Sequence, residues 1–249
     1  MYVVEYQVNM KVYLDNCILA DIEKGNLNLS DFSQIKDAEY FFSLAHICEL
    51  GRGVAKTPDL KRKRLSTLSE LCGENYLDQD SKGQSIERIC NSAEIIFDKC
   101  EPYRGYTELL ESKVSGYNPN RDKIIEELGI IKIEVGNIEP SKILCFIESK
   151  LMESSNRFGI DDFLRRSEAF TLKTKYLTLF NLLDSLFYWK DDKHINRLYD
   201  SAHACYAQYC DILVTNDRRM AIKAKAIYSY LGVKTIVKSS EEYIHLFVR

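Results

Sequence analysis

The sequence lacks several features that would place it in a specialised class of protein. Its 249 residues carry a formal net charge of -3, so there is no overall basic excess to attract nucleic acid, although a local patch could still bind it. No apolar run reaches about 18 residues, the length that a membrane-spanning helix needs. Internal repeats and low-complexity tracts are also missing. With a hydrophobic content of 45%, we expect one large domain, or a core with a large insertion.

The cysteines also lack recognisable motifs. None of the eight cysteines forms a C-x-x-C pair, and the Cys and His spacings fit no standard zinc site. Most of them fall within apolar helical patterns, as reduced core cysteines do. Residues 1–10 have no charged-then-apolar signal pattern. We therefore expect a cytoplasmic protein with free thiols and no membrane segment.

Both ends of the chain show the pattern of an α/β fold. Short apolar runs are followed by helical periodicity, and a strand, helix and strand over about 25 residues imply a parallel pair with a right-handed crossover. Gly232 follows the last apolar residue of one helix and is placed to end it. The predicted strands are 12–14, 39–43, 212–214 and 233–237, and the predicted helices are 17–22, 44–50, 195–209 and 220–231.

The middle of the chain, from about 57 to 187, has a different character. Apolar residues recur there mostly at the helical period, most clearly from Ile86 to Cys100. We expect this block to be almost all helix and to form an insertion or cap. The predicted helical stretches are 60–71, 86–100, 124–128, 143–151 and 163–189.

Four acidic residues are the most informative feature of the sequence. Asp15 and Asp217 follow apolar strands, Glu49 lies in a predicted helix, and Asp200 opens the run Asp200-Ser-Ala-His203. Ligands of an open α/β sheet bind at the carboxyl ends of its strands. Carboxylates that converge there would make an oxygen-rich site for Mg²⁺ or Mn²⁺. Without a cation, mutual repulsion would strain such a cluster.

Three of these acids also have an ordinary structural explanation. Asp15 and Asp217 are well placed to cap the helices that follow them, and the capping and metal-binding roles can coexist. Glu49 could be a solvated helix residue. His203 follows Asp200 by one helical turn, so it could support that acid, contact substrate, or fill a structural position.

Two groups of basic residues are weaker candidates for phosphate contacts. Arg218, Arg219 and Lys223 begin the helix after Asp217, and a second basic run covers residues 61–64. Both groups could bind phosphates, and both could equally form solvated helix faces.

The local motifs resemble those of PIN-domain proteins. They are Tyr13-Leu-Asp15-Asn16, Ala45-His-Ile-Cys-Glu49, Asp200-Ser-Ala-His-Ala and Val214-Thr-Asn-Asp217. The resemblance covers roughly residues 9–55 and 190–245. It implies a single PIN-like domain over residues 1–249, which is a three-layer α/β/α sandwich with a central, mostly parallel sheet. Its core segments would be about 9–55 and 190–249, with a helical insertion at about 57–187.

The resemblance also implies a function. PIN-like members include metal-dependent hydrolases that cut RNA as endoribonucleases, many of them toxins or defence effectors. By position, Asp15, Glu49, Asp200 and Asp217 would be the catalytic residues and the ligands of Mg²⁺ or Mn²⁺. Asn16, Thr215 and His203 would support them, and metal-activated water would attack the phosphodiester.

Expectations about partners follow from the same family. RNA is the expected substrate, with single-stranded DNA as the second choice. A toxin or antiviral enzyme needs restraint, so the expected protein partner is an antitoxin or a regulatory protein, or another copy of the chain in a homo-oligomer.

Two other functions stay open at the level of sequence. Arg197 and His203 have the arginine-x5-histidine spacing of HEPN ribonucleases, which are metal-independent and all-helical. The other alternative is a PIN-like subunit with little or no activity that binds partners within a larger complex. Four clustered acids would serve no purpose in such a subunit.

Overall fold

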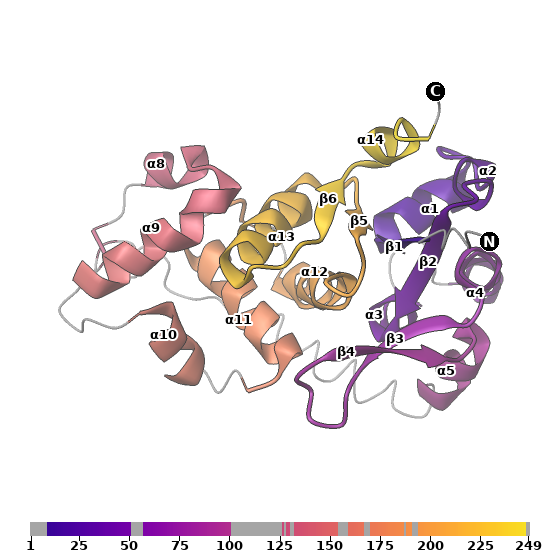
Figure 1. The fold of residues 1–249 in the computed structure, drawn as a ribbon, viewed down its shortest axis with the longest axis horizontal. Coiled ribbons are helices and arrows are strands. Elements are labelled where there is room, and N and C mark those ends of the chain that lie inside the picture. The colour runs from indigo at the N-terminus through magenta and orange to yellow at the C-terminus, as the bar shows by residue number, and fades with distance from the viewer. Residues whose placement is uncertain are drawn as a thin grey trace, which may run out of the picture.

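A six-stranded sheet runs through the molecule with helices around it (Figure 1). The strand order is β4-β3-β2-β1-β5-β6, and every neighbouring pair is parallel except β3 with β4. The strands are β1 Met10–Leu14, β2 Ala38–Ser43, β3 Asn75–Gln79, β4 Ile86–Cys90, β5 Ile212–Val214 and β6 Ile236–Lys238. The structure is a computed structural model that describes residues 9–50, 57–100, 126, 128–129, 132–153, 159–166, 170–186, 188–190 and 194–247.

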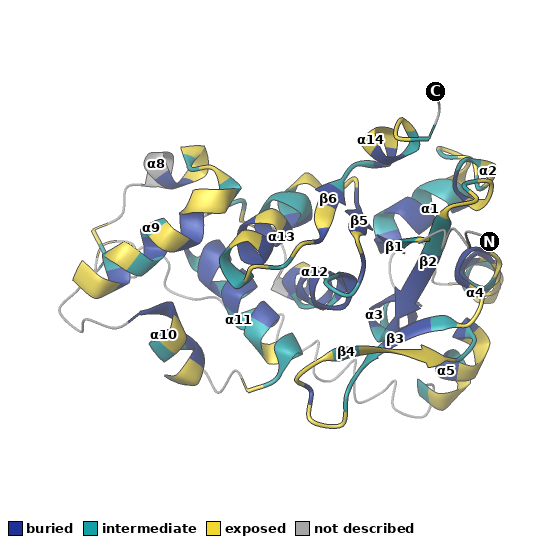
Figure 2. Cartoon of the chain, viewed as in Figure 1, coloured by how far each residue is buried: buried dark blue, intermediate teal, exposed yellow. Residues whose placement is uncertain are grey.

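The central strand β1 is buried on both of its faces. Val12 and Leu14 belong to one hydrophobic cluster, whereas Tyr13 between them belongs to the other. Side chains alternate across a strand, so the two clusters are the two faces of the sheet. Figure 2 shows the buried centre of the sheet beside the exposed edge strand β4. A parallel sheet needs this cover on both faces, and the layers are those of an α/β/α arrangement.

Different helices cover the two faces. The cluster that contains Val12 is completed by side chains of α1 Asn16–Lys24, α2 Ser30–Ser33, α4 Pro58–Cys72, α5 Ala93–Cys100 and α14 Ser240–Ile244. The cluster that contains Tyr13 is completed by α8 Lys132–Asn137, α9 Pro140–Glu153, α10 Ile160–Arg166, α11 Leu172–Ser185, α12 His194–Ala207 and α13 Arg218–Leu231. The short helix α3 Leu44–Cys48 contributes to both clusters.

The strand predictions for the two ends of the chain are confirmed. The runs ending at Asp15 and Thr215 form β1 and β5, which are parallel neighbours. The last strand, β6, lies slightly later than predicted and pairs in parallel with β5. Gly232 follows α13 with a φ of +68°. Its backbone N–H donates to the carbonyl oxygens of Ser229 and Tyr228. This left-handed conformation is available to glycine at little cost.

The prediction that residues 57–187 are almost all helix is wrong. β3 and β4 lie in this segment and extend the sheet beyond β2. Residues 86–90, predicted to begin the clearest helix, instead pair antiparallel with β3 over five residue pairs. The spacing of Ile86, Ile89 and Cys90 fits a helix, but pairing with β3 satisfies the backbone of the strand. The helix itself begins only at Ala93.

The other helices of this block differ from the sequence pattern mainly in their ends. α4 and α9 lie where helices were predicted. The long run from 163 to 189 is two helices, α10 and α11, and Thr171 caps the second of them. The stretch predicted at 124–128 lies mostly outside the described residues. Among the described helices, none is both long and apolar enough to cross a bilayer.

Candidate functional site

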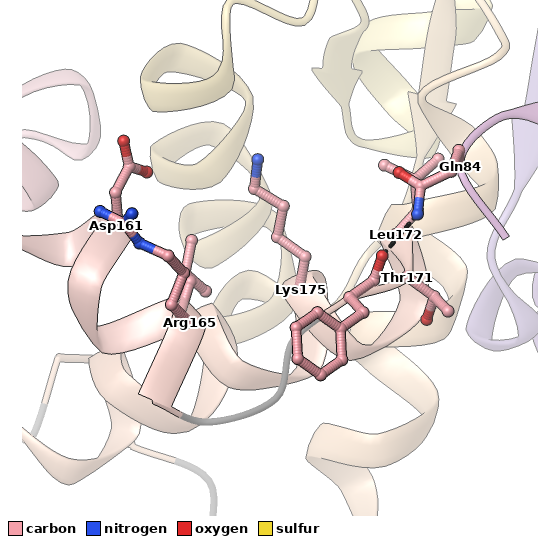
Figure 3. A pocket seen from close by; sticks show the side chains of 8 residues that line it. Gln84, Asp161, Arg165, Thr171, Leu172 and Lys175 are labelled. Carbon is pink, nitrogen blue, oxygen red and sulfur yellow. Dashed lines mark hydrogen bonds between the residues drawn. The ribbon is translucent and has the colours of Figure 1, made fainter.

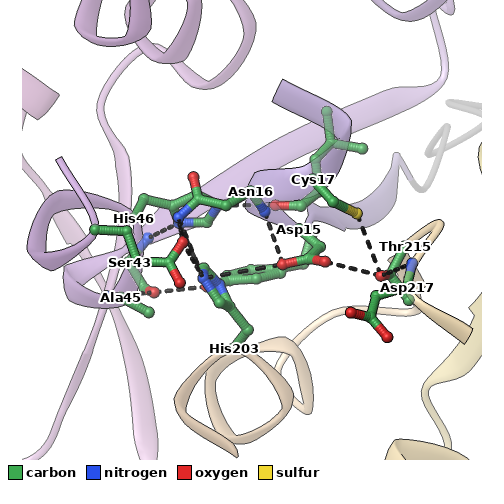
Figure 4. Close-up of polar contacts among 12 residues, drawn as sticks. Asp15, Asn16, Cys17, Ser43, Ala45, His46, His203, Thr215 and Asp217 are labelled. Carbon is green, nitrogen blue, oxygen red and sulfur yellow. Dashed lines mark hydrogen bonds and ion pairs between the residues drawn. The ribbon is translucent and has the colours of Figure 1, made fainter. Parts of the chain in front are cut away.

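Asp15 directly follows β1, and its carboxylate links the end of β1 to the end of the neighbouring strand β5. Its Oδ1 accepts a hydrogen bond from the backbone N–H of Asn16 at 2.7 Å, which makes it the N-cap of α1. Its Oδ2 accepts a hydrogen bond from Thr215 Oγ1 at 2.8 Å (Figure 4). Thr215 directly follows β5, the neighbour of β1. The sequence therefore places Asp15 at the sheet edge, and strand pairing brings Thr215 to it across 200 residues.

Asp217 is joined to Asp15 through the same threonine. Thr215 Oγ1 accepts a hydrogen bond from the Asp217 N–H at 3.0 Å. The Asp217 carboxylate caps α13, and its Oδ1 accepts from the N–H groups of Arg219 and Met220 at 2.8 and 3.0 Å. In Figure 4 the Asp217 side chain lies beside Thr215, on the same side as Asp15. The capping role is thus observed, and it leaves the second carboxylate oxygen outside the cap.

Glu49 and His203 complete the centre of the site. Glu49 directly follows α3, and its Oε2 accepts a hydrogen bond from Asn16 Nδ2. His203 projects from α12, and its Nε2 lies 3.6 Å from Glu49 Oε2 and 3.9 Å from Asp15 Oδ1. One carboxylate from the end of β1 and one from the end of α3 therefore border one imidazole nitrogen.

The opposite charges of His203 and Glu49 stabilise each other. Burial alone would lower the pKa of His203, but the hydrogen bond and charge of Glu49, with the charge of Asp15, outweigh it and raise that pKa. Burial alone would raise the pKa of Glu49, but His203, Asn16 and Arg64 outweigh it and lower that pKa. Both shifts favour a charged imidazolium beside charged carboxylates. A positive charge between Asp15 and Glu49 is therefore stabilising.

A buried polar network lies beneath His203. The Tyr13 hydroxyl is 2.8 Å from His203 Nδ1 and 2.6 Å from Ser43 Oγ. His46 Nδ1 accepts from the Ser43 N–H at 3.1 Å, and its Nε2 lies 2.7 Å from the Leu14 carbonyl oxygen. The proton of His46 is thus on Nε2. Burial, followed by the charge of His203, lowers the pKa of His46, so this ring stays neutral.

A second chain of contacts orients Asn16. Arg64, on α4, donates from Nη1 to Asn16 Oδ1 at 2.7 Å and forms a buried ion pair with Glu23. With its oxygen held by Arg64, the Asn16 amide presents its N–H₂ group to Glu49. The expected supporting role of Asn16 therefore has a geometric basis. Arg64 was expected in a solvated or phosphate-binding run, but it is buried.

Sequence patterns alone do not indicate the roles of Tyr13, Ser43, Arg64 and Glu23. Tyr13 is a typical β-strand residue, and Arg64 lies in a basic run that a surface helix would also contain. The one usable signal is the Ser43-x-x-His46 spacing, because serine at an N-cap favours a side chain that returns the hydrogen bond three residues later. The structure shows that capping box at the start of α3.

The remaining candidates fall in different places. Asp200 is half-buried on α12, one turn before His203. Arg218 is exposed and its guanidinium lies 4.6 Å from the centre of the Trp189 ring. Lys223 is fully buried, and its ammonium lies 5.4 Å from the centre of the Phe180 ring. The expectation that Lys223 contacts phosphate is therefore wrong for this structure, whereas Arg218 and the half-buried Arg219 keep partial access to solvent.

The donor set of the site suits a hard divalent cation in one specific way. In the described part of the chain, no three His, Cys, Asp or Glu side chains form a group arranged to hold a metal ion. Mg²⁺, however, usually keeps several waters and binds one or two protein carboxylates together with substrate phosphates. Asp15 and Glu49, which both border His203 Nε2, fit that mode of binding.

Comparisons with protein-family models, with curated proteins and with solved structures found no match for this chain. The geometry and chemistry of the site are therefore the basis on which its function can be argued.

Proposed function

We propose that this protein is a metal-dependent nuclease of the PIN-like type, and that its substrate is RNA. One observation carries the proposal. The carboxylates of Asp15, at the end of β1, and of Glu49, at the end of α3, converge on His203 Nε2 at the carboxyl edge of a mostly parallel sheet. Asp217 joins them through Thr215. Ligands of open α/β sheets bind at this edge.

The side chains have distinct roles in this proposal. Asp15 and Glu49 hold Mg²⁺ or Mn²⁺, with Asp217 and Asp200 as the further acids of the site. When bound, the cation supplies charge neutralisation at the phosphate and a more acidic attacking water. Thr215 fixes Asp15 by its hydrogen bond, and Asn16 fixes Glu49. His203 holds a proton at Nε2 next to both carboxylates and is placed to donate to a phosphate oxygen.

Cleavage and metal binding can be tested together. The chain is incubated with labelled single-stranded RNA in Mg²⁺, in Mn²⁺ and in EDTA, with single-stranded DNA in parallel. Mn²⁺ binding is measured separately by titration calorimetry. We expect metal-dependent RNA cleavage that EDTA abolishes.

Asp15→Asn is the critical variant, because asparagine also caps helices well and so preserves the start of α1. It should lose at least 100-fold in cleavage rate, the order of magnitude expected for loss of a group that stabilises the transition state, and its Mn²⁺ binding should weaken. Asp59→Asn is the matched control: this exposed acid on α4 pairs with the exposed Arg62 and is not one of the site residues. Parent-like cleavage and Mn²⁺ binding by Asp15→Asn would refute the proposal.

The two alternatives predict other results in the same assay. A HEPN-type enzyme would cut RNA in EDTA, but its fold is all-helical, and here a sheet forms the core. Arg197 is also buried and paired with Asp184, whereas His203 faces Asp15 and Glu49. A partner-binding subunit would show no cleavage under any condition.

A further inference from the structure

A hollow that shares no lining residue with the acidic site lies where three elements meet. It has a volume of about 430 Å³, within the range of small-ligand pockets. Helix α10, the start of α11 and the turn between β3 and β4 form its walls (Figure 3). The lining residues are Gln84, Asp161, Leu164, Arg165, Phe170, Thr171, Leu172 and Lys175.

The lining combines free positive charge with an exposed aromatic ring. In the part of the chain that the structure describes, Lys175 has no ion-pair partner. Arg165 pairs with Asp162 in an exposed contact that solvent screens. Phe170 is 68% exposed, more than any other large apolar residue described. The hollow therefore presents an exposed aromatic ring together with two cations.

The walls of this hollow are held in place by hydrogen bonds. Gln84 donates from Nε2 to the Phe170 carbonyl oxygen at 2.6 Å, and the Leu172 N–H donates to the Gly83 carbonyl at 2.8 Å. Thr171 caps α11 through a capping box with Thr174. The turn after β3 and the start of α11 are therefore fixed to one another, and Phe170 lies at this junction. In Figure 3 the Lys175 side chain extends between Asp161 and Gln84.

The topology places this hollow on the same side of the sheet as the acidic site. β3 is parallel to β2, and β2 is parallel to β1. The turn that carries Gln84 follows the carboxyl end of β3, just as Asp15 follows the carboxyl end of β1. Both sites thus belong to the edge where an open α/β sheet binds its ligands.

We infer that this hollow binds one nucleotide of a single-stranded nucleic acid. The base stacks on Phe170, and Lys175 with Arg165 contacts the adjacent phosphate. Asp161 accepts a hydrogen bond from an exocyclic amino group of the base. This contact explains why an acidic residue lines the hollow together with the two cations that bind phosphate. Single-strand sites combine aromatic platforms and basic side chains in this manner. This inference deepens the proposed function by adding a contact for the substrate strand.

Binding can be measured without cleavage, so that the two proposals fail separately. The full chain in EDTA is titrated into a fluorescein-labelled, 12-nucleotide single-stranded RNA, and anisotropy is followed at several salt concentrations. Phe170→Ala should weaken binding about 5- to 150-fold, the effect of losing one stacked base, with an unchanged salt dependence. Lys175→Gln should weaken binding and reduce the slope of log K against log salt by about 0.7, the value for one phosphate contact.

Matched controls come from α5, which carries an exposed apolar residue and an exposed lysine. Ile95→Ala and Lys99→Gln should bind as the parent does. Phe170→Tyr, which retains a stacking ring, should keep parent-like binding. Thermal unfolding of each variant verifies that the fold is intact.

Three results would overturn the inference. Parent-like affinity of both Phe170→Ala and Lys175→Gln would do so. Weaker binding by Lys175→Gln with parent-like binding by Phe170→Ala would indicate a surface that binds anions in general. Competition by polyglutamate that equals competition by unlabelled RNA would indicate the same. If the chain cleaves RNA while Phe170→Ala binds normally, the inference fails and the proposed function stands. If no RNA is cut but the two variants lose binding, the nucleotide site stands without the nuclease.

Discussion

The hydroxyl of Tyr13 is the point where the acidic site is joined to the core of the sheet. It lies within 2.8 Å of His203 Nδ1 and within 2.6 Å of Ser43 Oγ. By occupying Nδ1 of His203, it leaves Nε2 directed toward Asp15 and Glu49. A β-strand residue thus determines which nitrogen of the imidazole faces the carboxylates.

Removal of this hydroxyl should therefore affect stability and function together. Tyr13→Phe should lower the free energy of unfolding by about 1–3 kcal/mol, because Ser43 and His203 lose a buried partner. RNA cleavage by the variant should also fall. Urea unfolding and cleavage assays give the two values.

The matched control is Tyr40→Phe, which removes another buried tyrosine hydroxyl, one that bonds to the Phe32 carbonyl and lies 2.9 Å from the Tyr243 hydroxyl. It should lose similar stability and retain cleavage. A parent-like cleavage rate for Tyr13→Phe would show that Tyr13 does not position His203.

The two histidines of the site should have opposite effects on stability as the pH changes. His46, whose pKa is lowered from an ordinary 6.5, contributes stability that is present above that value and lost as the pH falls. His203, whose pKa is raised, contributes stability that is present below 6.5 and lost as the pH rises through its folded-state pKa. Each effect can change stability by at most about 1.4 kcal/mol per pH unit.

Variants at these positions separate the two effects. In EDTA, the stability lost by His46→Gln should be larger at pH 8 than at pH 5. The stability lost by His203→Gln should be larger at pH 5 than at pH 8. Denaturant unfolding over this pH range measures both, and losses that do not depend on pH would contradict the charge states assigned to these rings.

At the level of elements, a buried ion pair joins two long helices. Asp184 of α11 and Arg197 of α12 pair by a side-chain contact, and both are almost fully inaccessible to solvent. Asp184→Asn should cost about 3–5 kcal/mol of unfolding free energy, because it removes the negative charge that Asp184 places beside the buried Arg197.

The control for this pair is an exposed one on α10. Asp162→Asn breaks the contact with Arg165, which solvent screens, and should cost less than about 1 kcal/mol. The double variant Asp184→Leu with Arg197→Met should recover much of the loss, because apolar packing can replace a buried pair. Equal stability of Asp184→Asn and the parent would show that the pair contributes nothing.

Elements also show how far the sequence determines the fold. The strands before Asp15 and Thr215 were predictable because a short apolar run in front of a helical pattern has few other interpretations. β4 was not predictable, because Ile86 and Ile89 fit a helix as well as an edge strand, and only the partner strand β3 decides between them. Likewise, Asp15 and Glu49 could be proposed from local motifs. Arg64 and Tyr13 act through residues distant in sequence, which no local pattern contains.

At the level of the whole molecule, a divalent cation should stabilise the fold. A ligand that binds only the folded state adds about 2.7 kcal/mol at 100 times its dissociation constant. Saturating Mn²⁺ should therefore raise the melting temperature by several degrees, and EDTA should reverse the change. Asp15→Asn should lose this response, whereas Asp59→Asn should retain it. Differential scanning fluorimetry gives the comparison, and an unchanged melting temperature in saturating Mn²⁺ would argue against a cation at this site.

The hydrogen bond from Thr215 to Asp15 joins positions 200 residues apart. During translation, Asp15 leaves the ribosome long before the strand that carries Thr215 exists. If the chain cuts RNA as proposed, the nascent polypeptide is harmless to its own message until Thr215 and Asp217 have been synthesised and have joined Asp15. A copy truncated by a premature stop codon anywhere before position 203 would also lack half of the catalytic centre. The wide separation of its parts thus keeps shorter translation products inactive.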